Sequence, residues 1–299
     1  MLKPAIAFLL GTSLAATAVA QQPAPPADDG SSGEIVVQGA RNLDKQVSAF
    51  VNALADAPVK GQLGRFEFTV CPGAVGLDEL QNVAVARRMR RIAEAIGLRV
   101  GPIGCTPNAL LMVTGNKREL IETLYKRRPG YFQGVGRDNV NALARSEARA
   151  AAWQVEGRVD ADGVEVPRDK IGGQYIVERT DAPSRLSNAS RPHFIASVVV
   201  VEADALAGLS ITQVADYAAM RSFARTDPAR LKGSPVSSIL KVLDAPMGSA
   251  VPITMTEWDF AFLKALYGSN ANRFAFQQRN EMKHLLQEEL VRPSPQQHQ

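Results

Sequence analysis

An apolar run near the middle of the chain, residues 194–201 (Phe-Ile-Ala-Ser-Val-Val-Val-Val), limits the fold more than any other segment. A run of this length that is rich in β-branched residues is typical of a buried strand. The chain has 299 residues, of which 45% are hydrophobic, so it is long enough to enclose such a strand in a globular core. The sequence therefore predicts a globular fold organised around residues 194–201.

A helix is predicted directly after this strand, over residues 210–224. Ser210 and Gln213 have the spacing of a capping box, which marks a helix start. Several residues fall on one narrow face that can pack closely on the strand: Ile211, Val214, Ala215, Ala218 and Ser222. Asp216 and Arg221 are then expected on the solvent side. A further helix is predicted over residues 256–268.

The remaining segments predict an α+β fold with a mixed sheet and packed helices. Strands are expected at 66–71 and 109–113, with a peripheral strand at 33–41. A hairpin is expected within 148–177, with strands 153–159 and 164–166 around the turn Asp160-Ala161-Asp162-Gly163. Helices are expected at 43–56, 77–96, 117–128 and 270–291. The inward face of the helix at 77–96 is predicted to comprise Leu80, Val83, Ala84, Ala86, Met89, Ile92, Ala93 and Ile96. Residues 33–291 are thus expected to form one globular region, with sub-lobes at 65–132 and 148–291.

The first twenty residues have the pattern of a secretory signal peptide. Lys3 supplies the positive charge, an apolar region begins at Ala5, and Ala18-Val19-Ala20 predicts cleavage after Ala20. The alternative, a retained membrane anchor, is disfavoured because Gly11, Thr12 and Ser13 interrupt the apolar region. No later stretch reaches the roughly 18 apolar residues of a membrane span. Residues 21–32 and 292–299 are predicted to be a disordered leader and tail.

The two cysteines, Cys71 and Cys105, lie in the part of the chain predicted to be exported. A pair of cysteines in an oxidising compartment usually forms a structural disulfide. Closing a loop of about 35 residues stabilises a protein by roughly 3–4 kcal/mol. The alternatives, a redox-active pair or a metal site, lack the Cys-x-x-Cys spacing and further nearby ligands.

Residues 33–41 (Gly-Glu-Ile-Val-Val-Gln-Gly-Ala-Arg) resemble the start of the mature N-terminal region in many TonB-dependent outer-membrane receptors. The chain is too short for a whole receptor, so this resemblance implies only a Gram-negative envelope. Together with the signal peptide, it predicts a periplasmic or secreted protein.

Residues 194–268 resemble the C-terminal half of zincin-type metalloproteases of the matrixin and metzincin kind. The shared features are a strand, a helix, a Ser238-Ile239-Leu240 turn and a last helix ending in Leu266-Tyr267-Gly268. The family's His-Glu-x-x-His motif falls on Ala215, Asp216 and Ala219. Alanine cannot bind zinc, and no histidine lies between His193 and His284. The resemblance therefore implies a metal-free, degenerate zincin-like domain without a cofactor, as in poorly characterised exported bacterial proteins. The other hypothesis is an unrelated α+β architecture.

Asp216 is the candidate catalytic residue, as a base without an activated water. Glu202 and Asp204 are near the same strand–helix junction, and two carboxylates about 5 to 9 Å apart can hydrolyse glycosides. This leaves a metal-independent hydrolase as the alternative function. His193 is expected to be a surface or partly buried structural residue. The sequence has neither a Gly-x-Ser-x-Gly elbow in its mature part nor a phosphate-binding glycine loop.

The candidate binding residues are four arginines around the inward-pointing Met89: Arg87, Arg88, Arg90 and Arg91. Lys117, Arg118 and residues 126–128 add charge on the next helix, so two helices side by side would form one cationic face. The expected partner is an envelope protein or an anionic component such as lipid headgroups or lipopolysaccharide phosphates. Nucleic acid is not expected, because the net charge is only +4 and interleaved aromatic residues are absent. An ordinary solvated face, partly neutralised by nearby glutamates, is the alternative. The sequence favours an exported protein of a non-catalytic binding or scaffolding type.

Overall fold

The computed structural model describes residues 31–55, 61–168, 175, 189–246 and 248–292. The chain divides into two compact units, Met1–Ala40 and Arg41–Gln299. Helix α1 (Ser31–Leu54) includes residues 33–41, so the strand predicted there is wrong. Helix formation is cooperative, and the buried Phe50 and Leu54 hold the end of α1 in the core. The predicted signal peptide, most of the leader and most of the tail lie outside the described residues.

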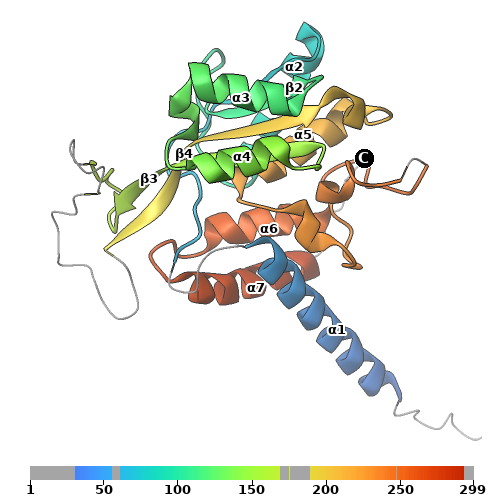
Figure 1. Ribbon diagram of the computed structural model, residues 1–299. Helices are drawn as coiled ribbons and strands as arrows, with labels where there is room; N and C mark the ends of the chain where they lie inside the picture. Colours follow the sequence, from blue (N-terminus) through green and yellow to red (C-terminus); the bar gives the residue numbers. More distant parts are fainter. Residues whose placement is uncertain (1–30, 56–60, 169–174, 176–188, 247, 293–299) are drawn as a thin grey trace, which may run out of the picture. The chain divides into compact units, whose positions relative to one another are not determined.

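Within the described residues, four strands form one mixed sheet: β1 (Pro72–Val75), β2 (Ala109–Thr114), β3 (Ala150–Asp160) and β4 (Ser190–Glu202) (Figure 1). Their order is β1-β2-β4-β3. Strand β2 pairs in parallel with both β1 and β4, whereas β3 pairs antiparallel with β4. The predicted α+β class with a mixed sheet is confirmed.

Strand β4 lies between β2 and β3, and its valines face two separate cores. Val199 and Val201 belong to the larger core, and Val198 and Val200 belong to the smaller one. Because both faces of β4 are covered, every residue from Val198 to Val201 is buried. This accounts for the apolar run, which does not alternate with polar residues.

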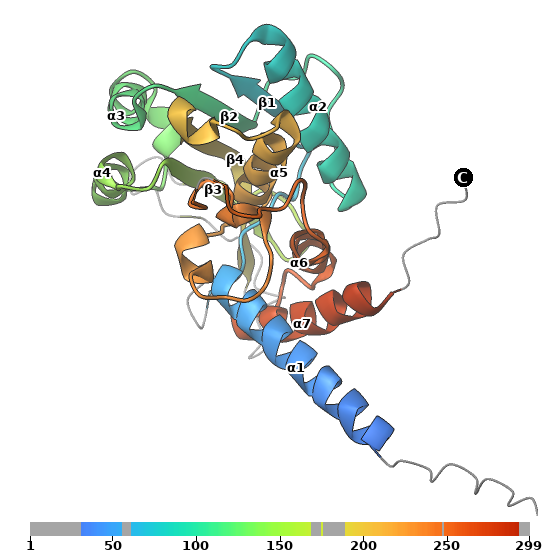
Figure 2. The same cartoon turned by 90° about the vertical axis from the view of Figure 1, so that its right-hand side faces the viewer.

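Helices cover the two faces of the sheet separately (Figure 2). Helices α2 (Glu79–Ala95) and α5 (Ile211–Phe223) contribute to the larger core, and they contact each other. Helices α3 (Lys117–Arg127) and α4 (Arg137–Arg145) contribute to the smaller core on the opposite face. Helices α2 and α3 therefore do not lie side by side, and their basic residues do not form one cationic face.

The last two helices, α6 (Glu257–Gly268) and α7 (Ala275–Val291), pack against each other and complete the larger core. From α1, the ring of Phe50 meets Trp258 and Phe262 edge-on. In the described part of the chain, none of the helices has the length and apolar character needed to cross a membrane.

The strand predicted at 66–71 is wrong, since β1 begins only at Pro72. Residues 65–70 make two isolated bridges, Arg65 to His193 and Val70 to Val100. The burial does not follow the period-two pattern either: Phe66 and Val70 are buried, but Phe68, which that pattern places on the same face, is 39% exposed. Pro72 is tolerated in β1 because an edge strand leaves one side of its backbone unpaired.

The predicted hairpin is present but short. Residues 164–166 pair with the end of β3 through the bridge of Val159 to Glu165, and the Asp160 and Val166 amides donate to the Val164 and Arg158 carbonyls. The turn at 160–163 is present, and Gly163 has the positive φ of 85° that such a turn requires. The longer partner of β3 is β4, which lies on its other edge, because Val159 pairs with both Arg191 and Glu165.

Helix α2 buries a narrower stripe than predicted. Its buried residues are Val85, Met89, Ile92 and Ala93, which recur at helical spacing. In contrast, Leu80 and Val83 are 82% and 49% exposed. The predicted face covered too much of the helix circumference.

Cys71 and Cys105 form the predicted disulfide, with their Cα atoms 6.1 Å apart. The bond joins the residue before β1 to the loop before β2. Asn108 stabilises the chain next to the disulfide, because its side-chain oxygen accepts a hydrogen bond from the Cys71 amide at 2.7 Å. The disulfide thus fixes the edge of the sheet.

Candidate functional site

Helix α5 begins as predicted, with a capping box formed by Ser210 and Gln213. However, every residue from Gln213 to Phe223 is buried. Asp216 is fully buried and Arg221 is 7% exposed, so the predicted solvent side is wrong. The cause lies in the tertiary structure, since α2 and residues 252–255 cover Asp216, and Thr226 and the residues after it cover Arg221.

The Asp216 carboxylate accepts four hydrogen bonds. Arg88 donates two of them, from Nε to Oδ1 at 2.7 Å and from a terminal nitrogen to Oδ2 at 3.1 Å. Oδ2 also accepts from the Thr254 hydroxyl at 2.7 Å and from the Met255 amide at 2.6 Å. A bidentate arginine and two further donors satisfy a buried carboxylate. Asp216 therefore joins α2, α5 and the segment before α6.

The three acids considered together in the sequence do not share one cationic partner. Glu202 and Asp204 both form ion pairs with Arg149, and the Glu202 pair measures 2.9 Å. The hydrogen bond from Arg149 lowers the pKa of Asp204. Asp216 is paired with Arg88 instead. A catalytic arrangement of two carboxylates is therefore not evident at this junction.

The four candidate arginines divide into two pairs. Arg87 and Arg91 are exposed, and neither forms a hydrogen bond or ion pair with the described residues. Arg88 is bound to Asp216, and Arg90 donates to the Gly101 carbonyl and lies near Cys105 Sγ. Arg87 and Arg91 are four residues apart and therefore lie on the same side of α2, away from the partners of Arg88 and Arg90.

Sequence reasoning placed Lys117 on the cationic surface, but Lys117 is only 3% exposed. Its ammonium donates to the Ser146 carbonyl at 2.6 Å, to the Ser146 hydroxyl at 2.9 Å and to the Ala148 carbonyl. Burial lowers the pKa of Lys117, and Glu202 opposes this effect. These hydrogen bonds hold the start of α3 against the segment that leads into β3.

Asp259 is a second buried carboxylate, and sequence reasoning missed it. Its Oδ1 accepts from the Ser238 hydroxyl at 2.5 Å, and its Oδ2 accepts from the Ile239 amide at 2.7 Å. It also completes a capping box with Thr256 at the start of α6. The Ser-Ile-Leu turn, which contains the 3₁₀ helix η4 (Ile239–Lys241), is thereby held to α6. The Thr256-x-x-Asp259 pattern was the available signal.

At the positions of the family's zinc ligands, Ala215 and Ala219 are fully buried. Across the described ranges, no group of three or more His, Cys, Asp and Glu side chains could hold a metal ion. His193 is 1% exposed, so it is more deeply buried than expected. Neither ring nitrogen has a hydrogen-bond partner among the residues that the structure describes, and Glu165 is 3.9 Å from Nε2.

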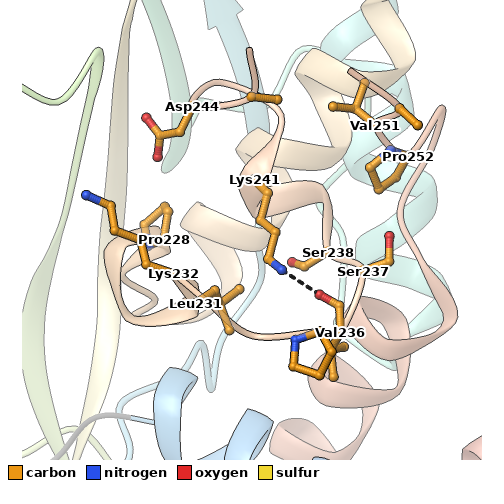
Figure 3. Close-up of a pocket in the computed structure, with 14 residues that line it drawn as sticks. Pro228, Leu231, Lys232, Val236, Ser237, Ser238, Lys241, Asp244, Val251 and Pro252 are labelled. Carbon is orange, nitrogen blue, oxygen red and sulfur yellow. Dashed lines mark hydrogen bonds between the residues drawn. The ribbon is translucent and has the colours of Figure 1, made fainter.

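Two cavities adjoin the hydrogen-bonded groups around Asp216 and Asp259. A groove of ≈ 440 Å³, called the α2–α6 groove, is lined by Arg88, Arg91, Ile92, Ala95, Met255, Thr256, Glu257 and Phe260. A cavity of ≈ 470 Å³, called the loop cavity, lies between residues 228–238 and 244–252 (Figure 3). Lys241 crosses the loop cavity, and its ammonium donates to the Val236 carbonyl at 2.8 Å (Figure 3). The polar side chains Ser238 and Lys241 are therefore already engaged there.

Comparisons with known proteins give no relative. No protein-family model matches the chain, and neither curated proteins nor solved structures include a match.

Proposed function

We propose that this is an exported protein of the Gram-negative envelope that binds an anionic partner without catalysing a reaction. The proposal includes a metal-free, degenerate zincin-like scaffold over residues 194–268, a signal peptide cleaved after Ala20 and a periplasmic or secreted location. The order of β4, α5, the Ser238 turn and α6 supports the scaffold. The partner is an anionic envelope component or an acidic envelope protein.

The observation that carries the proposal is the environment of Asp216. The residue at the position of the family's catalytic glutamate is fully buried and accepts four hydrogen bonds. A general base must reach the proton that it removes, directly or through one water. Asp216 reaches neither substrate nor bulk water, so its role is structural. This favours binding over the hydrolase alternative.

The surface beside Asp216 supports the binding role. Arg91 lines the α2–α6 groove together with Ile92, Met255 and Phe260, so a positive charge adjoins an apolar wall. Arg87 lies one helical turn before Arg91 and is also exposed. An exposed guanidinium without a protein partner is free to bind a phosphate or carboxylate in a bidentate manner. The contact surface is therefore Arg87, Arg91 and the groove, rather than all four arginines.

Paired charge-removing variants test the surface. The Arg87→Gln/Arg91→Gln variant is expected to lose at least tenfold in affinity for vesicles containing anionic phospholipid, measured by cosedimentation at low salt. Two surface arginines contribute about 1 kcal/mol each near an anionic membrane. Vesicles of zwitterionic phospholipid should bind neither protein.

The matched control is Arg127→Gln/Arg128→Gln. It removes the same charge from exposed residues at the end of α3, on the opposite face of the sheet. This control should bind anionic vesicles and envelope extract like the wild type. Equal losses in both double variants would show unspecific attraction, and no loss in the α2 variant would remove the proposed surface.

A further inference from the structure

A third cavity, separate from the surface of Arg87 and Arg91, contains a buried arginine that has no carboxylate partner among the described residues. This cavity of ≈ 290 Å³ is called the Arg221 cavity, and it lies where α5 meets residues 147–150, 227–232 and 243–244. It shares Pro228, Lys232 and Asp244 with the loop cavity, and Figure 3 shows Lys232 and Asp244 on the same side of that space.

Arg221 is 93% buried, given its 7% exposure. One terminal nitrogen donates to the Thr226 carbonyl at 2.6 Å, and Nε has no hydrogen-bond partner in the described part of the chain. Among the described residues, Arg221 forms no ion pair. A buried charge is costly unless it is paired and its donors are satisfied. The remaining donors of Arg221 therefore point to an anionic group that is not part of the protein.

Tyr217 lies one helical turn before Arg221 and lines the same cavity. It is 4% exposed, and its hydroxyl makes no hydrogen bond to the described residues. A tyrosine hydroxyl and a guanidinium one turn apart can bind the two oxygens of one carboxylate.

The other charges around the Arg221 cavity limit the ligand. Arg149 is already engaged with Glu202 and Asp204. The other charged side chains that line the cavity are two cations, Arg221 and Lys232, and three carboxylates, Glu147, Asp227 and Asp244. Asp227 caps the 3₁₀ helix η3 (Pro228–Leu231), and the Asp244 carboxylate forms no hydrogen bond or ion pair with the other described residues. This balance disfavours a multiply charged anion and favours a ligand that carries its own positive charge.

We propose that the Arg221 cavity binds a small α-amino acid, with its carboxylate on Arg221 and Tyr217 and its ammonium group on Asp244. The volume suits this class, because ≈ 290 Å³ is at the lower limit of ligand pockets. The site stands apart from the proposed anionic contact at Arg87 and Arg91, so either proposal can fail without the other.

Titration calorimetry of the purified protein with glycine, L-alanine and L-leucine tests this site. At least one of these amino acids should bind saturably, and acetate and inorganic phosphate should bind at least tenfold more weakly. The Tyr217→Phe variant should lose about tenfold in amino-acid affinity, the effect of one hydrogen bond to a charged group. Asp244→Asn should weaken amino-acid binding and leave acetate binding unchanged.

The matched control is Tyr131→Phe, which removes a hydroxyl from a partly exposed tyrosine outside the cavity. It should bind amino acids like the wild type. Phosphate binding as tight as amino-acid binding would overturn the ligand class. Undetectable binding of all three amino acids, or unchanged binding by Tyr217→Phe, would overturn the site.

Discussion

At the scale of single residues, several charged side chains are buried, which the sequence pattern did not predict. Asp216, Asp259 and Lys117 are each nearly or fully buried, and each is surrounded by hydrogen-bond partners from other elements. A buried polar network of this kind specifies one arrangement of the elements, because breaking it leaves an unpaired charge. The hydrogen bonds of these residues therefore hold neighbouring elements of the fold together.

The Asp216→Asn variant is expected to lower the free energy of unfolding by about 3 kcal/mol. The value lies at the lower end for a buried ion pair because the Arg88 side chain is 30% exposed. Urea unfolding at neutral pH measures the loss. An unchanged unfolding midpoint would contradict the structural role and would revive the hydrolase alternative.

The control for this variant is Glu122→Gln, which breaks the exposed pair between Arg118 and Glu122 on α3. Exposed i,i+4 pairs contribute little because water and salt screen them. The unfolding midpoint of Glu122→Gln should stay close to that of the wild type.

At the scale of elements, capping and periodicity in the sequence predicted most helices, whereas the strands depended on pairing between remote segments. The capping box at Ser210, the helix at 256–268 and the strand 109–113 lie within a residue or two of their predicted places. Residues 66–71 have the alternation of a strand, yet they pair mainly through isolated bridges. Alternation in the sequence is a local property, whereas a strand also needs a partner that is remote in sequence. That partner cannot be identified from the segment itself.

The pairing of β3 with β4 also makes His193 sensitive to pH. Gly157 of β3 is opposite His193, and a Cβ there would overlap the ring. Burial lowers the pKa of His193 below 6.5, Glu165 and Glu67 oppose this shift, and Arg191 adds to it. As the pH falls below 6.5, the unfolded chain binds a proton before the folded protein does. The stability contribution is therefore complete above pH 6.5 and is lost as the pH falls toward the folded pKa.

Urea unfolding between pH 7.5 and pH 5 tests this behaviour. The wild type should lose stability across this range, and His193→Gln should show a smaller loss over the same interval. Comparing slopes with pH removes any constant packing cost of the substitution. His284→Gln, which alters a partly exposed histidine of α7, should keep the wild-type slope. Equal slopes in the wild type and His193→Gln would contradict the prediction.

At the scale of the whole molecule, one sheet separates two cores, and a disulfide secures the edge of the sheet at β1. Strand β1 has only four residues, so pairing alone holds it weakly. The disulfide between Cys71 and Cys105 closes a loop across 34 positions, which stabilises the fold by roughly 3–4 kcal/mol. Disulfides persist in oxidising compartments, which agrees with the proposed export.

One peptide-mapping experiment tests export and disulfide together in protein expressed with its natural N-terminus in a Gram-negative host. The N-terminal peptide should begin at Gln21, and the peptides with Cys71 and Cys105 should remain linked until reduction. Protein from the cytoplasm of a strain lacking export should contain free thiols. A chain that keeps its first twenty residues in the periplasmic fraction would contradict the predicted cleavage.

The sequence by itself determined the α+β class, the buried strand at 194–201, the start of α5 and the cysteine pair, because each depends on local periodicity, capping or spacing. The tertiary structure decided which polar residues are buried. Asp216 is covered by α2 and residues 252–255, whereas Arg221, on another side of α5, is covered by residues 147–150 and 226–232. Contacts with Asp216 and with the Gly101 carbonyl likewise separate Arg88 and Arg90 from the exposed Arg87 and Arg91. Burial depends on neighbours that are remote in sequence, so no local pattern could reveal it.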